Sequence, residues 1–428
     1  MRKYLACAAV LALAIAACTE ITTLKQENPG QLDASLVYLP KNALLLVNGA
    51  IGDFECAFSR YVTGSAILGD ELTNAISQTT NFDYDRRTIT TSQTYGTNTC
   101  ASGVQQPGVY SPISTARATA DTILARLQVW TDADVPNRQK LIGQAAAYAG
   151  YSLILLGEGM CTAAINLGPE IQPAAVFTEA KARFDIAVTA ATGAADNTTL
   201  NFARLGRARA LLNLGGANVA LAETDAALIP AGFVVNMSTD AVNTRRQNVV
   251  FISTAQSNFS SVDTSFRRLT IGGNPDPRVA LTNTGKTGTA GKTASDTIYT
   301  PNKYPNAASP IAITKYQEAQ LIIAESRVAA NDLTGAETAI NRSRSQTAGL
   351  PAYSATGQTA AQVQAQIVEE RRREFFLEGH RFGDVRRLNL PLVPAPGVAY
   401  RNGGLLGNQN CFPLPDVERI NNPTISHP

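Results

Sequence analysis

Residues 370–387 read Glu370-Arg371-Arg372-Arg373-Glu374-Phe375-Phe376-Leu377-Glu378-Gly379-His380-Arg381-Phe382-Gly383-Asp384-Val385-Arg386-Arg387, the most charged run in a chain with 16% charged residues. The run continues an amphipathic helix whose apolar positions include Val363 and Ile367. The same helical spacing places Glu370, Glu374 and Glu378 on the side that faces a protein core. Buried carboxylates need cationic partners, and the arginines of the run are candidates for that role.

This charged run has two interpretations. In a catalytic site, Glu374 or Glu378 would be the acid and His380 would carry protons. Nearby arginines lower carboxylate pKa values, however, and favour fixed ion pairs over proton transfer. Glu369 and Arg373 also have the spacing of an ordinary helical ion pair. We therefore interpret the run as a structural ion-pair network that joins the last helix to the rest of the fold. Its expected members are Glu370, Arg371, Arg372, Glu374, Glu378, Arg381, Asp384 and Arg387.

Composition narrows the possible functions. The 428 residues are 44% hydrophobic, so a substantial core is available, and the formal net charge is only +2. A nearly neutral chain offers no electrostatic basis for binding nucleic acid. With two histidines and no C-x-x-C spacing, neither a metal site nor a cofactor is expected.

The N-terminus predicts export. Residues 1–17 have a short basic start and an apolar stretch too short to span a bilayer, as in a signal peptide. The small residues Ala16 and Ala17 before Cys18 resemble the lipobox of bacterial lipoproteins, a family in which this cysteine carries acyl chains. The alternative is an ordinary signal peptide with an incidental cysteine. We expect lipidation at Cys18, stable membrane attachment, and a polar tether over 18–35.

Four further cysteines remain in the exported part of the chain. In an oxidising compartment they predict two disulfides, with three possible pairings. We favour Cys56–Cys100, which closes the shortest loop, together with Cys161–Cys411.

Hydrophobic periodicity predicts a mainly α fold in one body, residues 36–428. Helical repeats are expected over about 36–70, 111–230 and 311–388, and helix pairs of this length are typical of tetratricopeptide-like stacks. Polar segments at about 74–110 and 231–310 predict a loop-rich, partly β region, including a strand or loop at 249–252. The tail, 389–428, is expected to wrap the surface without regular structure.

Enzyme motifs are incomplete in this chain. Gly285-Lys286-Thr287 and Gly291-Lys292-Thr293 resemble the end of a phosphate-binding loop, but the required preceding glycines are absent. Gly157-Glu158-Gly159 lacks the third glycine of a dinucleotide fingerprint, and no nucleophile elbow or H-E-x-x-H sequence occurs. A lipoprotein hydrolase would need a carboxylate pair in an open cleft, which no motif marks. We therefore expect a protein that is not an enzyme.

The charged run resembles a family signature. Glu370-Arg371-Arg372-x-Glu374 followed by Glu378-Gly379-x-Arg381-Phe382-x-Asp384-x-x-Arg387 is similar to the pattern E-R-R-x-E, E-G-x-R-[WF]-x-D-[LI]-x-R of the RagB/SusD family of outer-membrane nutrient-uptake lipoproteins. Here Phe382 replaces the commoner tryptophan and Val385 the leucine or isoleucine. Other segments also resemble the family, namely Ala324-Glu325-Ser326, Asn341-x-x-Arg344, Asp276-Pro277-Arg278 and Phe412-Pro413-Leu414-Pro415.

This resemblance implies a scaffold of four tetratricopeptide-like helix pairs that carries a loop-rich ligand-binding part. It implies a lipid-anchored protein of the outer membrane, facing the cell surface, that captures oligosaccharides or peptides and passes them to a SusC-like, TonB-dependent transporter. The alternative function is a tetratricopeptide-type envelope adaptor that binds another protein.

Ligand residues do not transfer from the family, because its binding aromatics lie in variable loops. Exposed aromatic side chains that could stack on sugar rings are the best candidates in this sequence. They are Phe82, Tyr84, Tyr95, Tyr110, Phe259, Phe266 and Tyr299. Trp130, the only tryptophan, ends an expected helix and is assigned to the core.

Overall fold

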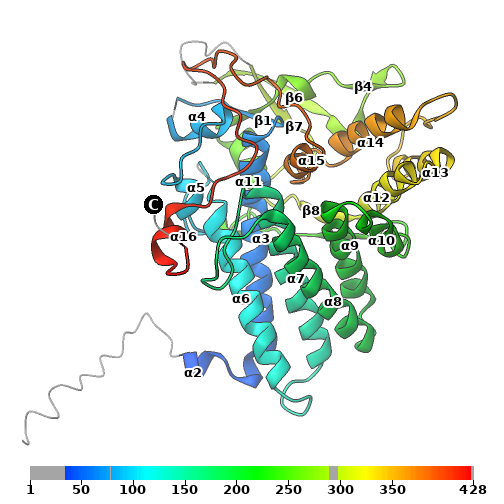
Figure 1. The fold of residues 1–428 in the computed structure, drawn as a ribbon. Coiled ribbons are helices and arrows are strands. Elements are labelled where there is room, and N and C mark those ends of the chain that lie inside the picture. The colour runs from blue at the N-terminus through cyan, green and yellow to red at the C-terminus, as the bar shows by residue number, and fades with distance from the viewer. Residues whose placement is uncertain (1–33, 78, 106, 289–296, 426–428) are drawn as a thin grey trace, which may run out of the picture.

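The computed structural model describes residues 34–77, 79–105, 107–288 and 297–425. The predicted signal peptide, the lipidation site Cys18, most of the tether and the Gly291-Lys292-Thr293 motif lie outside these ranges. Long helices form one end of the molecule, and short strands and loops gather at the other (Figure 1). The prediction of a mainly α fold with a loop-rich, partly β region is confirmed. No helix in the described ranges has the length and hydropathy that crossing a bilayer requires.

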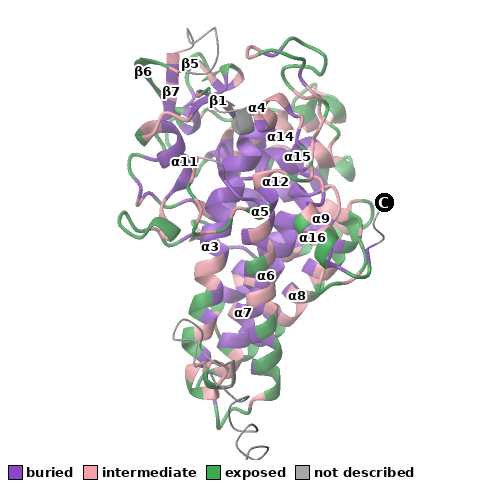
Figure 2. Ribbon diagram, turned by 90° about the vertical axis from the view of Figure 1, so that its left-hand side faces the viewer, coloured by how far each residue is buried: buried purple, intermediate pink, exposed green. Residues whose placement is uncertain are grey.

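Two groups of helices make up the scaffold. The first comprises α3 (Ala43–Leu68), α6 (Tyr110–Val129), α7 (Arg138–Gly159), α8 (Pro173–Gly193), α9 (Asn197–Leu214) and α10 (Asn218–Ala226). The second comprises α12 (Tyr316–Ala329), α13 (Leu333–Arg344), α14 (Ala360–Glu374) and α15 (Arg381–Arg387). Helices α9 and α10 share one apolar core with α12, α13 and α14, so the two groups form a continuous scaffold. Buried residues run along the helices through the centre of the molecule (Figure 2).

Local sequence signals set several helix ends. The Thr359 hydroxyl accepts a hydrogen bond from the Gln362 N–H, and the Gln362 side chain accepts one from the Thr359 N–H, so α14 opens with a capping box. Asp332 caps α13 in a similar way by accepting from the Gly335 N–H at 2.8 Å. At the other end, α14 stops at Glu374, before Gly379, which takes a positive φ of 79° in the turn to α15.

Close packing inside the stack depends on glycines that face one phenylalanine. Phe184 of α8 is fully buried between α7 and α9. A Cβ added at Gly206 would lie 2.3 Å from the Phe184 ring, and one at Gly150 would lie 2.7 Å from it. Glycine is therefore the only residue that fits at either position without a shift of the Phe184 ring.

Replacing Gly206 with alanine is expected to destabilise the fold by about 1–3 kcal/mol, because the added methyl group overpacks a well-filled core. Urea unfolding of the variant measures the loss. Gly193→Ala is the matched control, since a Cβ there meets no atom within 4 Å. Equal stability of the two variants would contradict this account of the packing.

Within the described residues, the short strands form four antiparallel pairs. They are β1 (Leu72–Asn74) with β3 (Ser260–Val262), β2 (Val234–Asn236) with β8 (Ala312–Lys315), β4 (Thr270–Ile271) with β5 (Asn274–Pro275), and β6 (Leu281–Thr287) with β7 (Thr297–Pro301). Short helices are α2 (Ala34–Val37), α4 (Thr79–Arg86), α5 (Thr94–Thr97), α11 (Val249–Phe251) and α16 (Asp416–Asn421). Single 3-10 turns occupy Pro40–Asn42, Thr244–Arg246, Thr264–Phe266 and Pro277–Val279.

Three expectations from the sequence need correction. Residues 249–252 are helical, because the Asn248 side chain accepts a hydrogen bond from the Phe251 N–H and caps α11, which continues into a π-helical turn at Ile252–Gln256. The segment 74–110 contributes to the core through three tyrosines instead of lying wholly on the surface. Trp130 is only partly buried at the end of α6.

The C-terminal tail is fixed to the stack and contains the short helix α16, so the expectation that it lacks regular structure is wrong. Disulfides join Cys56 to Cys100 and Cys161 to Cys411, which is the pairing favoured from the sequence. Next to the second disulfide, the Phe412 N–H donates to the Gly159 carbonyl at 2.9 Å. The Phe412 ring is fully buried, so the tail is inserted into the fold.

Candidate functional site

The charged run is a buried ion-pair network whose carboxylates find their partners in distant segments. Glu370 is 1% exposed and accepts hydrogen bonds from Arg278 at 2.7 Å, from Arg344 at 3.2 Å and from Gln366 at 2.6 Å. Burial alone would raise the pKa of Glu370, but the guanidinium groups of Arg344 and Arg278 outweigh it and hold that pKa below its usual value. The expectation that the run supplies these partners itself is wrong for Glu370.

Lysines neutralise the next two carboxylates. The ammonium of Lys315 lies 3.0 Å from Glu374 and 2.9 Å from Glu378, and Lys303 also bonds to Glu378. Although burial favours the neutral acid, the two ammonium groups lower the pKa of Glu378. Both lysines lie outside the run that the sequence singled out, so neither was expected as a partner.

The arginines of the run reach in other directions. Arg381 makes a bidentate pair with Asp70 at the end of α3, at 2.8 and 2.6 Å. Arg387 bonds to Glu325 of α12, while Asp384 accepts from Arg371 at 2.8 Å. Arg372 donates to the Ser265 carbonyl in the loop-rich part at 2.6 Å. The network thus ties the end of α3, α12, the loops and α15 to one another.

His380 does not have the environment of a proton carrier. It is 3% exposed, stacks on Phe375 with ring centroids 4.3 Å apart, and lies 3.3 Å from an Arg209 nitrogen that donates to its Nε2. Burial and the neighbouring cations hold the pKa of His380 well below its ordinary value, so its ring is neutral. We therefore assign this cluster to the scaffold.

Four of the seven aromatic candidates are core residues, so the expectation that their rings are exposed is wrong. Tyr84, Tyr95, Tyr110 and Phe266 are each at most 2% exposed. The Phe412 ring from the tail covers Tyr84 and Tyr95, with ring centroids 5.7 and 5.4 Å away. No ring face of these residues is available to a sugar.

The other three aromatic candidates, Phe82, Phe259 and Tyr299, are half-buried. Two of them lie next to one hollow: Phe82 contacts Tyr400 edge-to-face at 6.2 Å, and the guanidinium of Arg267 lies 4.3 Å from the centre of the Tyr299 ring. Both Tyr400 and Arg267 line this hollow. Phe259 lines none of the hollows described below.

We call this space the tail hollow, because the C-terminal tail forms one of its walls. Its volume is about 190 Å³. Its lining residues come from β1, α4, the turn after β3 and the tail, and they are Thr73, Asp85, Asp263, Thr264, Arg267, Pro394, Val398, Ala399, Tyr400, Arg401 and Leu406. An apolar wall with a few convergent polar groups is typical of small-molecule binding sites.

The polar groups of the tail hollow are held in place by the protein. The Tyr400 hydroxyl donates to Asp85 at 2.9 Å, and Asp85 also accepts from the Asn74 N–H at 3.0 Å. Burial raises the pKa of Asp85 despite these hydrogen bonds and the nearby Arg401. Arg267 donates to the Val262 carbonyl at 2.9 Å, which fixes its guanidinium against β3. These contacts hold the Tyr400 ring, the Arg267 guanidinium and the Asp85 carboxyl group in fixed positions around the same space.

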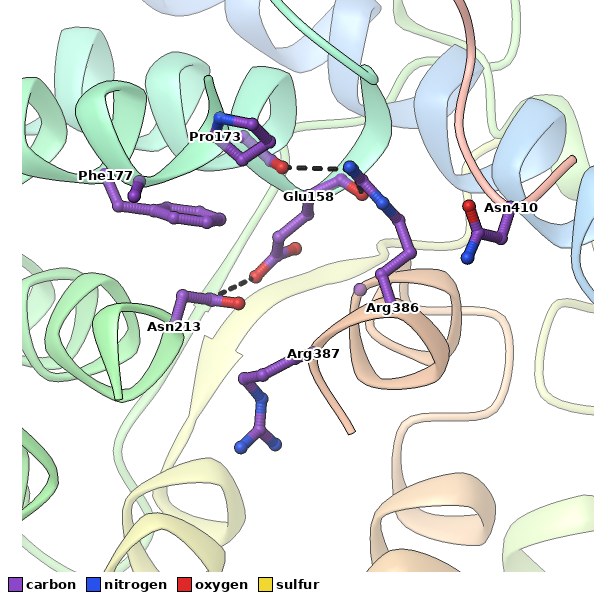
Figure 3. Close-up of a pocket in the computed structure, with 10 residues that line it drawn as sticks. Glu158, Pro173, Phe177, Asn213, Arg386, Arg387 and Asn410 are labelled. Carbon is purple, nitrogen blue, oxygen red and sulfur yellow. Dashed lines mark hydrogen bonds between the residues drawn. The ribbon is translucent and has the colours of Figure 1, made fainter. Parts of the chain in front are cut away.

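A second hollow, of about 330 Å³, lies where α15 meets α7, α8 and α9 (Figure 3). Glu158 lines it but is paired with Arg209 at 2.6 Å and accepts from Asn213 at 2.9 Å. Arg386 donates to three backbone carbonyls at the end of α7, at 2.7 to 3.1 Å. Because the protein already pairs these charges, we assign this hollow to the seam between helices.

Two further hollows adjoin the scaffold. One, of about 380 Å³, lies beside Lys303, Lys315 and Glu374, whose charges pair with one another or with the network. The other, of about 330 Å³, lies against α6 and α8 next to the ion pair of Asp121 and Arg183. Of the hollows described, only the tail hollow combines an apolar wall, an aromatic ring and a position among the loops.

The chain matches a known family model over part of its length and shares its fold with several solved structures. Residues 240–411 match the family model described as the SusD family. A SusD-like carbohydrate binding protein from Bacteroides vulgatus has a TM-score of 0.65 at 15% identity, covering 90% of this chain and 97% of that one. A SusD superfamily protein from Bacteroides fragilis has a TM-score of 0.67 at 13% identity, covering 91% and 99%.

A third similar structure is surface glycan-binding protein A from Bacteroides fluxus, with a TM-score of 0.58 at 14% identity, covering 80% of this chain and 88% of that one. Identities this low show a shared fold and leave ligand residues undetermined. No curated protein matches the chain.

Proposed function

Because the chain belongs to the SusD/RagB family, we propose that it is a cell-surface glycan-binding protein, without enzymatic activity, that holds oligosaccharides in the tail hollow. The observation that carries this proposal is the group of fixed side chains around one hollow in the loop-rich part: Tyr400, Arg267 and Asp85. Solved proteins of the same fold include one described as carbohydrate binding and one as surface glycan-binding. That likeness concerns only the fold, so the choice of ligand must be argued from the residues of the site itself.

The chemistry of the hollow suits part of a glycan chain. Its apolar wall and the Tyr400 ring can pack against the C–H faces of a sugar, while Asp85 and Arg267 can exchange hydrogen bonds with hydroxyl groups. The hollow is smaller than the roughly 300–1,000 Å³ of typical ligand pockets. It would therefore hold one or two sugar units of a longer chain whose other units lie along the surface.

The proposal also includes delivery of the glycan to a transporter and anchoring of the protein in the membrane. The captured glycan would pass to a TonB-dependent, SusC-like transporter of the outer membrane, and acyl chains on Cys18 would hold the protein beside it. A peptide ligand is the alternative within the same role. Co-purification of a TonB-dependent barrel with the tagged protein supports this part of the proposal, and a protein that copurifies with no barrel contradicts it.

Arg267→Ala and Tyr400→Phe are expected to weaken glycan binding, the first by about fivefold or more, since losing a central contact costs more than about 1 kcal/mol. Calorimetric titration against a panel of glycans and peptides measures the affinities. Arg245→Ala is the matched control, because this arginine is half-exposed and does not line the hollow. Full affinity in Arg267→Ala, with the fold intact, would move the binding site elsewhere.

The envelope-adaptor alternative rests on a different surface. The hollow against α6 and α8 is lined mostly by residues of these two helices, as expected for a tetratricopeptide-type groove that binds a protein segment. Substitution of Gln128 on that surface distinguishes the two functions. Loss of a protein partner with unchanged glycan binding would favour the adaptor.

A further inference from the structure

Four large aliphatic side chains are exposed together at one end of the helical stack. Leu36 is 64% exposed, Leu44 60%, Leu45 71% and Val129 80%. Leu44 and Leu45 lie in the first turn of α3, and both side chains point to the surface. We call this set of four residues the apolar tip.

One hydrogen bond and the spacing along two helices place the four residues at one end of the molecule. The Thr119 hydroxyl of α6 donates to Asp53 of α3 at 3.2 Å, in the middle of the two antiparallel helices. Leu44 lies as far before Asp53 as residue 128 lies after Thr119, so the start of α3 is level with the end of α6. Figure 1 shows α2 beside these two helix ends, away from the loop-rich part.

The surroundings of the apolar tip have the composition of a membrane-interface surface. Lys41 and Arg126 are exposed there, and the Arg126 guanidinium lies 5.6 Å from the centre of the Tyr38 ring. Tyr38 and Trp130 are half-buried at its margin. Exposed leucines flanked by amphipathic aromatic rings and basic side chains are the pattern of surfaces that rest in the headgroup region of a bilayer.

We propose that the apolar tip docks on a lipid bilayer and orients the protein on the membrane. This inference rests on the proposed acylation of Cys18. Residues 19–33 connect that cysteine to α2, and so short a segment reaches at most roughly 55 Å. An anchor at that distance keeps the tip at high effective concentration near the bilayer, so weak contacts suffice. The elements that line the tail hollow, among them β1 and α4, lie at the other end of the molecule (Figure 1), so docking would leave this hollow open to glycans.

The only tryptophan of the chain is a built-in probe for this proposal. Trp130 follows Val129 at the margin of the apolar tip. The lipidated full chain would be reconstituted in phosphatidylethanolamine–phosphatidylglycerol vesicles with brominated acyl chains. Fluorescence of Trp130 is expected to be quenched relative to vesicles without bromine. In Leu44→Ser/Leu45→Ser the quenching should fall by about twofold or more, because the tip no longer enters the interface.

Leu221→Ser/Leu228→Ser is the matched control, since these leucines are 55% and 53% exposed on and after α10. It should be quenched like the wild type. Flotation of the wild-type protein with the vesicles, but without quenching, would overturn docking while leaving the anchor intact. Quenching that is unchanged in Leu44→Ser/Leu45→Ser would also overturn it.

A chain that starts at Thr19 separates docking from anchoring, because it has no cysteine to acylate at its start. If the full chain does not float, the proposed anchor has failed. Quenching of the chain from Thr19 at high lipid concentration, lost in its Leu44→Ser/Leu45→Ser form, would then still support docking. Absence of quenching in both chains would overturn it.

Discussion

Glu370→Ala is expected to lose about 3–5 kcal/mol of folding free energy, the range for removing one partner of a buried ion pair. The reason is the charge left behind. Glu370 is 1% exposed and compensates both Arg278 and Arg344, whose side chains are 3% and 8% exposed. Without the carboxylate, two guanidinium groups would stay in the core beside each other with fewer acceptors.

Urea unfolding of Glu370→Ala at neutral pH measures this loss. Glu370→Gln should lose less, because the amide oxygen still accepts hydrogen bonds from the two arginines. Asp132→Ala is the control: its side chain is 73% exposed, and its pair with Arg138 should contribute about 1 kcal/mol or less. Unchanged stability combined with lost glycan binding would instead show that the charged run is part of a binding site.

Glu71→Gln is expected to be more stable than the wild type above pH 8, by up to about 5 kcal/mol, since each unit of pKa corresponds to about 1.4 kcal/mol. Burial raises the pKa of Glu71 from 4.5 to about 8, and neighbouring Asp70 adds to the rise. The Leu377 N–H, which donates to this carboxyl group at 2.8 Å, opposes the rise without cancelling it. A glutamine side chain keeps that acceptor and carries no charge.

The sign of the pH dependence follows from the two pKa values of Glu71. Between pH 4.5 and 8 the folded protein binds more protons at this group than the unfolded chain, so stability falls as pH rises through that window. His380 acts in the opposite direction, because its folded pKa lies well below 6.5 and stability falls as pH drops below that value. Both proteins contain His380, so its contribution cancels in their difference.

Unfolding curves of the wild type and Glu71→Gln near pH 4.5 and above pH 8 test this expectation. The two proteins should have similar stability at the lower pH, where Glu71 is protonated in the folded protein and about half protonated in the unfolded chain, and should diverge at the higher pH. A difference that does not change with pH would mean that Glu71 titrates normally in the folded protein.

The residues that could bind a ligand were not identifiable from the sequence alone. The polar segments predict exposed aromatic residues, but Tyr84 and Tyr95 are covered by Phe412, more than 300 residues later in the chain. Tyr400, the aromatic residue that does line the tail hollow, lies in a proline- and glycine-rich tail and has no local pattern that marks it. Its meeting with Asp85 could have been found only from the fold.

The sequence by itself determined the helical class, the caps at Thr359 and Asp332, and the buried stripe of Glu370 and Glu374. These features depend on the helical period and on neighbours within a few residues, so the local sequence is sufficient to specify them. Only the tertiary structure decided which cations meet those carboxylates, which aromatic rings are covered and where a hollow remains. Burial and ion pairing at these positions depend on segments far away in the chain, whose approach is set by the packing of the whole fold.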